Sequence, residues 1–177
     1  MKKKFYSSTA WLENIKDKEY YQSYVENCEA NNETPGDMES DAFLQYAIED
    51  CNNLLEDEMA NLECSKKLEG KWLIFGTVGR WNGNFSMLPQ VVNSITEALR
   101  KCFADDIDIE YDKKGIYVAA HHHDATNHFQ IRQLTNKAEN AFYEDEDRFL
   151  EKLGCYSDDL LAGKHKSLFN PIPEYLY

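Results

Sequence analysis

Apolar side chains recur at helical spacing through the first third of the chain. Residues 10–30 follow potential N-caps at positions 7–9 and carry one stripe, formed by Tyr20, Tyr21, Tyr24 and Cys28. Residues 41–64 follow the potential N-cap Ser40 and carry a second stripe, formed by Phe43, Ala47, Cys51, Leu54, Leu55, Met59 and Leu62. Because Pro35-Gly36 marks a turn between them, the pattern predicts an antiparallel helical hairpin. Glu58 falls within the second stripe, and the pattern gives no reason for a carboxylate there.

Short apolar segments replace the helical pattern after Gly70. We expect strands, because β-branched and aromatic residues are frequent there, at residues 72–78, 85–88, 107–111, 116–122 and 129–134. Asn82-Gly83 is typical of a hairpin turn. Ser94 is the expected N-cap of a short helix that ends near Phe103. A last helix is expected from Thr135 or Asn136 to Leu153, where Gly154 follows.

These elements predict an α+β fold. The N-terminal helical hairpin precedes a mainly antiparallel sheet, and two helices are expected to pack on one face of that sheet. We expect an acidic helical arm at residues 1–66, an α+β sheet domain at 67–153 and an irregular C-terminal tail at 154–177. A chain of 177 residues is expected to form one folded unit from these parts.

Composition favours a folded protein of the cytoplasm. Hydrophobic residues make up 42% of the chain and aromatic residues 13%, which is enough for a core. The five cysteines form no C-x-x-C pair, so we expect reduced core residues rather than a disulfide framework or a zinc ribbon. The basic N-terminus lacks the apolar region of a signal peptide, and no apolar run approaches the ~20 residues of a membrane span. No association with a membrane is therefore expected.

Charge is distributed unevenly along the chain. There are 19 Lys and Arg residues against 32 Asp and Glu residues, for a formal net charge of -13. Residues 19–65 contain thirteen of these carboxylates and no Lys or Arg, so the rest of the chain is balanced. Solvated helices usually intersperse both signs, because oppositely charged pairs four residues apart stabilise them. The segment instead has the electrostatic character of a nucleic-acid backbone.

The acidic segment supplies the predicted partner-binding residues. Glu49, Glu56 and Glu63 recur every seven residues, a step of about 10.5 Å along a helix, which is close to three base-pair steps of B-DNA. The predicted contact residues are Glu19, Glu26, Glu29, Glu33, Asp37, Glu39, Asp41, Glu49, Asp50, Glu56, Asp57 and Glu63. Two alternatives stay open for these carboxylates, namely a solvated surface that aids solubility and acidic docking without mimicry.

Four of the five histidines lie together at residues 121–128. On a strand His121 and His123 point to one face, and with His128 across the corner they form a candidate zinc or other transition-metal site. Asp124 is a potential fourth ligand or hydrogen-bond acceptor. The alternative is a corner held by Asx-type hydrogen bonds from Asp124 and Asn127, which needs no metal.

No catalytic motif is found in the rest of the sequence. The segment Gly76-Thr77-Val78-Gly79-Arg80 matches neither G-x-G-x-x-G nor G-K-[ST], and no Ser or Cys nucleophile signature is present. The chain also lacks the basic face of a nucleic-acid-binding protein, so direct binding to nucleic acid is not expected. We therefore predict a protein that is not an enzyme and uses no cofactor.

The histidine corner also resembles a sequence pattern that occurs in other proteins. Residues 122–132 are H-H-D-A-T-N-H-F-Q-I-R, similar to H-H-D-G-T-N followed by an aromatic residue and an Arg in small proteins of Firmicutes phages and mobile elements. The resemblance covers residues 72–134, and its most specific positions are His122, His123, Asp124, Thr126, Asn127 and Arg132. Ala125 stands where those proteins have Gly, which weighs against a corner with positive φ at that position.

This resemblance implies a context in which the acidic arm has a use. Such mobile-element proteins include inhibitors of host defence, among them anti-CRISPR proteins acting on Cas9-type nucleases and antirestriction proteins. We therefore predict an inhibitor that acts in the cytoplasm of a bacterial host cell. Its expected partner is a basic nucleic-acid-binding protein, such as a Cas9-type nuclease with its guide RNA, whose positive channels hold nucleic acid. The alternatives are a metal-dependent hydrolase using His121, His123 and His128, or an acidic accessory protein without mimicry.

Overall fold

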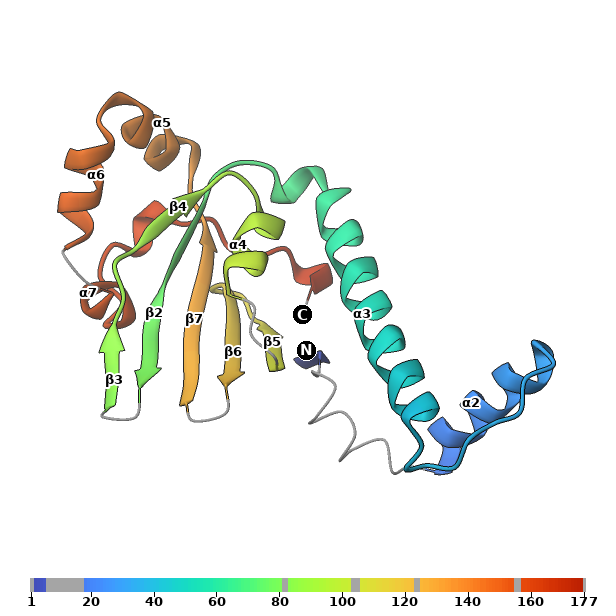
Figure 1. Ribbon diagram of the computed structural model, residues 1–177. Coiled ribbons are helices and arrows are strands. Elements are labelled where there is room, and N and C mark those ends of the chain that lie inside the picture. Colours follow the sequence, from blue (N-terminus) through green and yellow to red (C-terminus); the bar gives the residue numbers. More distant parts are fainter. Residues whose placement is uncertain are drawn as a thin grey trace.

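The computed structural model describes residues 2–5, 18–80, 83–102, 106–122, 125–154 and 157–176. Its centre is an antiparallel sheet in the strand order β1-β5-β6-β7-β2-β3, with β4 also pairing with β2 (Figure 1). The strands are β1 (Lys2–Phe5), β2 (Trp72–Arg80), β3 (Gly83–Ser86), β4 (Gln90–Val92), β5 (Asp106–Tyr111), β6 (Ile116–His122) and β7 (Ala125–Gln133). The α+β class and the antiparallel sheet expected from the sequence are confirmed.

Helices flank this sheet and extend beyond it (Figure 1). The α-helices are α2 (Lys18–Ala30), α3 (Asp41–Glu63), α4 (Ile95–Lys101), α5 (Asn136–Glu144), α6 (Glu146–Leu153) and α7 (Asp158–Leu161). Three short 3-10 turns are η1 (Lys66–Leu68), η2 (Lys166–Leu168) and η3 (Glu174–Leu176). Within the described ranges, no helix is both long enough and apolar enough to cross a membrane.

The two faces of the sheet bury different side chains, because successive residues of a strand alternate between faces. Trp72 and Ile74 of β2 join one core, together with Ile95 and Leu99 of α4 and Leu62 of α3. The neighbouring β2 residues join a second core on the opposite face with residues of α5, α6 and α7, formed by Leu73, Phe75, Ala138, Phe149, Leu153 and Leu160. The expectation that two helices pack on one face was therefore wrong, since α4 and the α5–α6 pair cover opposite faces.

The expected last helix is divided in two at Asp145. That residue has an extended backbone, with φ −162° and ψ 94°, so it cannot continue α5. Its side chain accepts a hydrogen bond of 3.0 Å from the Arg148 N–H and thereby serves as the N-cap of α6. The segment 154–177 also contains α7, η2 and η3, so it is more ordered than the irregular tail that the sequence suggested.

The arm is joined firmly to the rest of the protein at one end. Leu62 near the end of α3 belongs to the first core, and Leu55 packs against that core from the same helix. β1 lies on the edge of the sheet and pairs with β5, although residues 2–5 belong to the segment 1–66 that the sequence assigned to the arm. The expected boundary at residue 66 is therefore not a boundary between independent units.

Three of the cysteines, Cys28, Cys64 and Cys102, are free thiols. Cys28 and Cys102 are buried, as expected, but Cys64 at the end of α3 is exposed and is not a core residue. The expected first helix begins near residue 10, and its part before Lys18 lies outside the described residues.

Candidate functional site

An aromatic cluster holds α2 against α3 and so determines which side chains of the arm face outward. Tyr24 of α2 lies 5.1 Å from both Phe43 and Tyr46 of α3, measured between ring centroids. The loop is fixed by the same cluster, because the Tyr21 hydroxyl donates to the Gly36 carbonyl at 2.7 Å and Tyr24 Oη accepts from the Gly36 N–H at 3.1 Å. Ser40 caps α3 as predicted, accepting from the Phe43 N–H at 3.2 Å.

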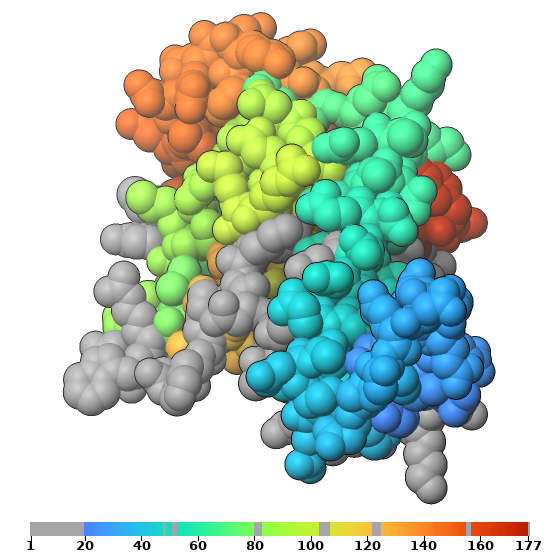
Figure 2. Space-filling model, turned by 45° about the vertical axis from the view of Figure 1, so that its right-hand side comes forward, coloured from blue at the N-terminus to red at the C-terminus, as the bar shows by residue number. Residues whose placement is uncertain are grey.

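The acidic residues occupy the surface that this cluster leaves free. Figure 2 shows α2 in blue and the first half of α3 in cyan, both at the molecular surface, and Figure 1 shows that they extend beyond the sheet. Asp50 is half-buried, and the exposed carboxylates among the predicted contact residues are Glu26, Glu29, Glu33, Asp37, Glu39, Asp41, Glu49, Glu56, Asp57 and Glu63. The side chain of Glu19 lies outside the described residues.

Three of these residues form a row along α3. A seven-residue step in an α-helix drifts by about 20°, so Glu49, Glu56 and Glu63 lie within about 40° of one another around the helix axis. Asp50 and Asp57 form the adjacent row at the same seven-residue spacing. The arm therefore presents two parallel rows of carboxylates on α3, as the sequence spacing predicted.

Neutral groups, rather than cations, contact these carboxylates in the described part of the chain. Asp50 accepts from the Tyr20 hydroxyl at 3.0 Å, and Glu63 accepts from the Thr96 hydroxyl at 2.7 Å. Glu26 and Glu49 accept from glutamine side chains one helical turn away. The Lys–carboxylate ion pair identified among the described residues lies elsewhere, between Lys164 and Asp159. No Lys or Arg whose side chain the structure describes forms an ion pair with these carboxylates, while the side chains of residues 2–4 on β1, which contacts α3, lie outside the described residues.

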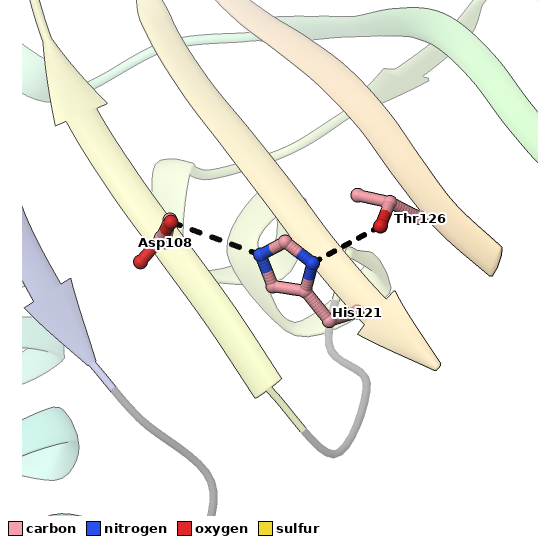
Figure 3. Close-up of polar contacts among 3 residues, drawn as sticks. All are labelled: Asp108, His121 and Thr126. Atoms are coloured by element: carbon pink, nitrogen blue, oxygen red, sulfur yellow. Dashed lines mark hydrogen bonds and ion pairs between the residues drawn. The ribbon is translucent and has the colours of Figure 1, made fainter. Parts of the chain in front are cut away.

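In the described part of the histidine corner, polar groups of the protein surround His121. His121 of β6 lies between two partners on neighbouring strands (Figure 3). Its Nε2 is 3.7 Å from Asp108 Oδ2 on β5, and its Nδ1 is 3.1 Å from Thr126 Oγ1 on β7. Both ring nitrogens therefore face polar groups of the protein. Asn127 adds a further link, since its side-chain oxygen accepts from the Gly79 N–H of β2 at 2.8 Å.

The predicted metal ligands are brought together only in part. His121 and His128 point to the same face, because β6 pairs with β7 so that His121 is opposite Thr126 and His128 is opposite Ala119. His123, the third predicted ligand, and Asp124 lie outside the described residues. The described residues contain no group of three His, Cys, Asp or Glu side chains placed to hold a metal ion.

A shallow cavity of about 230 Å³ lies on the same face of the sheet as His128. Its walls come from four strands, since Asp108, Ala119, His128 and Thr77 are aligned across β5, β6, β7 and β2. The cavity exists because the second core covers the sheet chiefly at β2 and leaves the region over β5 and β6 open. The structure thus adds Asp108 and Thr77 to the surroundings of the histidines.

Two positions singled out by the resemblance have structural roles. Ala125 is the first residue of β7 and pairs with His122, and its φ is not positive, so this position does not require Gly. The Arg132 guanidinium lies 4.2 Å from the centre of the Phe169 ring, and burial lowers the pKa of this guanidinium from its usual value.

Comparison of the chain with protein-family models, with curated proteins and with solved structures finds no match. The function is therefore argued from the geometry and charge of the surface.

Proposed function

We propose that this protein binds a host enzyme that handles nucleic acid and inhibits it, with the acidic surface of α2 and α3 in the partner's phosphate-binding groove. The observation that carries the proposal is the projecting arm itself. It holds ten exposed carboxylates from the predicted set, and none of them forms an ion pair with a Lys or Arg whose side chain the structure describes. The protein acts by occupying the groove and performs no catalysis.

The repulsion between these uncompensated carboxylates costs stability, and this cost favours an external partner for the surface. Like charges held on one small arm repel one another and destabilise the compact state. Oppositely charged neighbours on the same helices would relieve that repulsion, but residues 19–65 contain none. A partner lined with Lys and Arg would relieve it on binding, and complementary potentials would also accelerate association.

A Cas9-type nuclease loaded with its guide RNA is the partner that we propose to test first. It holds nucleic acid in positively charged channels. The resemblance of residues 72–134 to proteins of phages and mobile elements supports the same context, the cytoplasm of a bacterial host cell. Binding is measured by biolayer interferometry and inhibition by cleavage of a DNA target, each at several salt concentrations.

Matched neutralising variants separate mimicry from the effect of total charge. The test variant is Glu49→Gln/Glu56→Gln/Asp57→Asn, which removes three exposed carboxylates from the two rows of α3. The control variant removes three exposed carboxylates outside the arm, Glu144→Gln/Asp147→Asn/Glu151→Gln. We expect the test variant to lose at least tenfold in affinity at low salt, and the control to stay within about twofold.

The outcomes are distinct. Loss of binding in the test variant alone, together with a steep fall in affinity as salt rises, supports the acidic arm as the contact surface. Equal binding by both variants would overturn it and leave the acidity as an aid to solubility. Failure of the nuclease to bind at any salt concentration would overturn this choice of partner.

A further inference from the structure

A second candidate binding surface lies at the far end of the molecule from α2. The α5–α6 pair stands at one end of the sheet and the acidic arm at the other (Figure 1). Between α5, α6 and the segment around η2 there is a cavity of about 490 Å³. Cavities of 300–1,000 Å³ are typical of sites for small molecules.

Three cations line this cavity. They are Lys137 of α5 and Arg148 and Lys152 of α6, and all three are exposed. In the described part of the chain none of them forms an ion pair, although Glu144 and Asp145 lie on the same rim. Asp145 is already used, because its carboxylate caps α6. The rim therefore carries three cations against two carboxylates, a local balance that favours an anion although the whole chain has a net charge of -13.

The floor of the cavity is apolar. Ala138, Phe149, Leu153 and Leu168 contribute to it, and the first three also belong to the second core. An inorganic anion would leave this floor unused. The combination of an apolar floor with a cationic rim fits a molecule that has an apolar body and an anionic head.

The wall opposite the helices contains an unusual backbone conformation. His165 has a φ of 63° and a ψ of 23°, which is the left-handed region that residues other than Gly seldom adopt. Such conformations persist where the surrounding structure determines them, and they are frequent at binding sites. His165 and Ser167 thereby place an imidazole and a hydroxyl on the rim, where they can donate hydrogen bonds to an anionic head.

We propose that this cleft, defined by Lys137, Arg148, Phe149, Lys152 and His165, binds an organic anion with an apolar body, either a carboxylate or a phosphate ester. The apolar body would lie on Phe149 and Leu153, and the head would lie among the three cations. This site is separate from the acidic arm, so it does not depend on the inhibitory function proposed above.

The proposal is tested on the full chain by NMR titration with four probes below their micelle concentrations. Decanoate and decyl phosphate are the two anionic probes and distinguish the two kinds of head. Inorganic phosphate tests the head alone, and decyltrimethylammonium tests the apolar body with the opposite charge. We expect saturable shifts of amides in α5, α6 and η2 with at least one anionic amphiphile, and binding at least tenfold weaker for the other two probes.

Two variants test the cations and the floor separately. Arg148→Glu/Lys152→Glu should lose at least tenfold in affinity for the anionic amphiphile, and its control is Arg100→Glu/Lys101→Glu, which changes the charge equally at exposed positions of α4. Ala141→Phe keeps the charges but occupies the cleft, and it should also lose at least tenfold. Absence of saturable anion binding, equal binding of decyltrimethylammonium or inorganic phosphate, or unchanged binding in Arg148→Glu/Lys152→Glu would each overturn the proposal.

Discussion

Tyr111 Oη donates a hydrogen bond of 2.9 Å to Glu58 Oε1, and both residues are buried between β5 and α3. This contact explains why a carboxylate lies within the apolar stripe of α3. Burial, followed by the neighbouring Glu58 carboxylate, raises the pKa of Tyr111, so its hydroxyl keeps the proton that it donates. The bond joins the acidic arm to the sheet at a point far from the aromatic cluster of the hairpin.

Removing this donor should destabilise the protein. We expect Tyr111→Phe to lower the free energy of unfolding by about 1–3 kcal/mol, because a buried carboxylate loses a hydrogen bond. The measurement is urea denaturation followed by circular dichroism. Tyr143→Phe is the matched control, since Tyr143 is 68% exposed and should change stability by less than about 0.5 kcal/mol. Equal stability of the two variants would contradict the structural role of the Tyr111–Glu58 bond.

Ser157 should be similarly important, because its buried hydroxyl connects β2 with the residue that follows β3. Its Oγ accepts from the Gly76 N–H at 2.9 Å and donates to the Met87 carbonyl at 2.7 Å. Ser157→Ala leaves the buried Gly76 N–H without this acceptor, so we expect a loss of about 1–3 kcal/mol in unfolding free energy. Ser167→Ala, at an exposed position, is the control. An effect no larger than that of the control would show that water or another group replaces the hydroxyl.

Stability should fall in alkaline solution because of a buried thiol. Burial raises the pKa of Cys102 from 9.0 to about 12. Above pH 9 the unfolded chain loses this proton while the native protein keeps it, so the native state binds more protons and the unfolding free energy decreases as pH rises. The slope from this one group approaches about 1.4 kcal/mol per pH unit between pH 9 and 12.

The measurement is urea denaturation at several pH values between 8 and 10.5. Cys102→Ala should show a shallower decrease than the unaltered protein, whatever its stability at pH 8. Cys64→Ala is the control, because it removes a thiol from an exposed position. Identical slopes for all three proteins would mean that Cys102 ionises with equal ease in both states.

Repulsion within the acidic arm should be measurable without any partner. Glu49→Gln/Glu56→Gln/Asp57→Asn should raise the melting temperature by a few degrees at low ionic strength, because three like charges are removed from one side of α3. The gain should shrink at 0.5 M salt, where the charges of the unaltered protein are screened. Thermal melts at both ionic strengths provide the test. A melting temperature that falls at low salt would indicate that these carboxylates stabilise the native state.

Local sequence signals predicted most of the elements, and particular residues show why they worked. Ser40 and Ser94 each accept from an N–H three residues later, as side chains at helix N-caps do. The β-branched and aromatic segments formed β2, β5, β6 and β7 near the expected positions. Such signals act within one turn or one strand, so the chain carries them before any long-range contact forms.

Elements that depend on a neighbour were missed. β1 (Lys2–Phe5) has no apolar alternation and exists because β5 offers an edge with which it can pair. β4 has only three residues and depends in the same way on β2. The sequence also did not predict that the last helix divides into α5 and α6 at Asp145. An aspartate in a helical pattern fits an exposed position within a helix as well as it fits an N-cap.

The sequence by itself determined the class of fold, the hairpin of α2 and α3 and the concentration of charge on that hairpin, because each depends on spacing between nearby residues. Only the tertiary structure decided what those residues meet. It placed Tyr111 against Glu58 and Thr96 against Glu63, it set α4 and the α5–α6 pair on opposite faces of the sheet, and it gathered Lys137, Arg148 and Lys152 around one cavity. The first three relationships join segments far apart in the chain, and the fourth depends on the break between α5 and α6 and on the distant η2 segment, so no local periodicity encodes them.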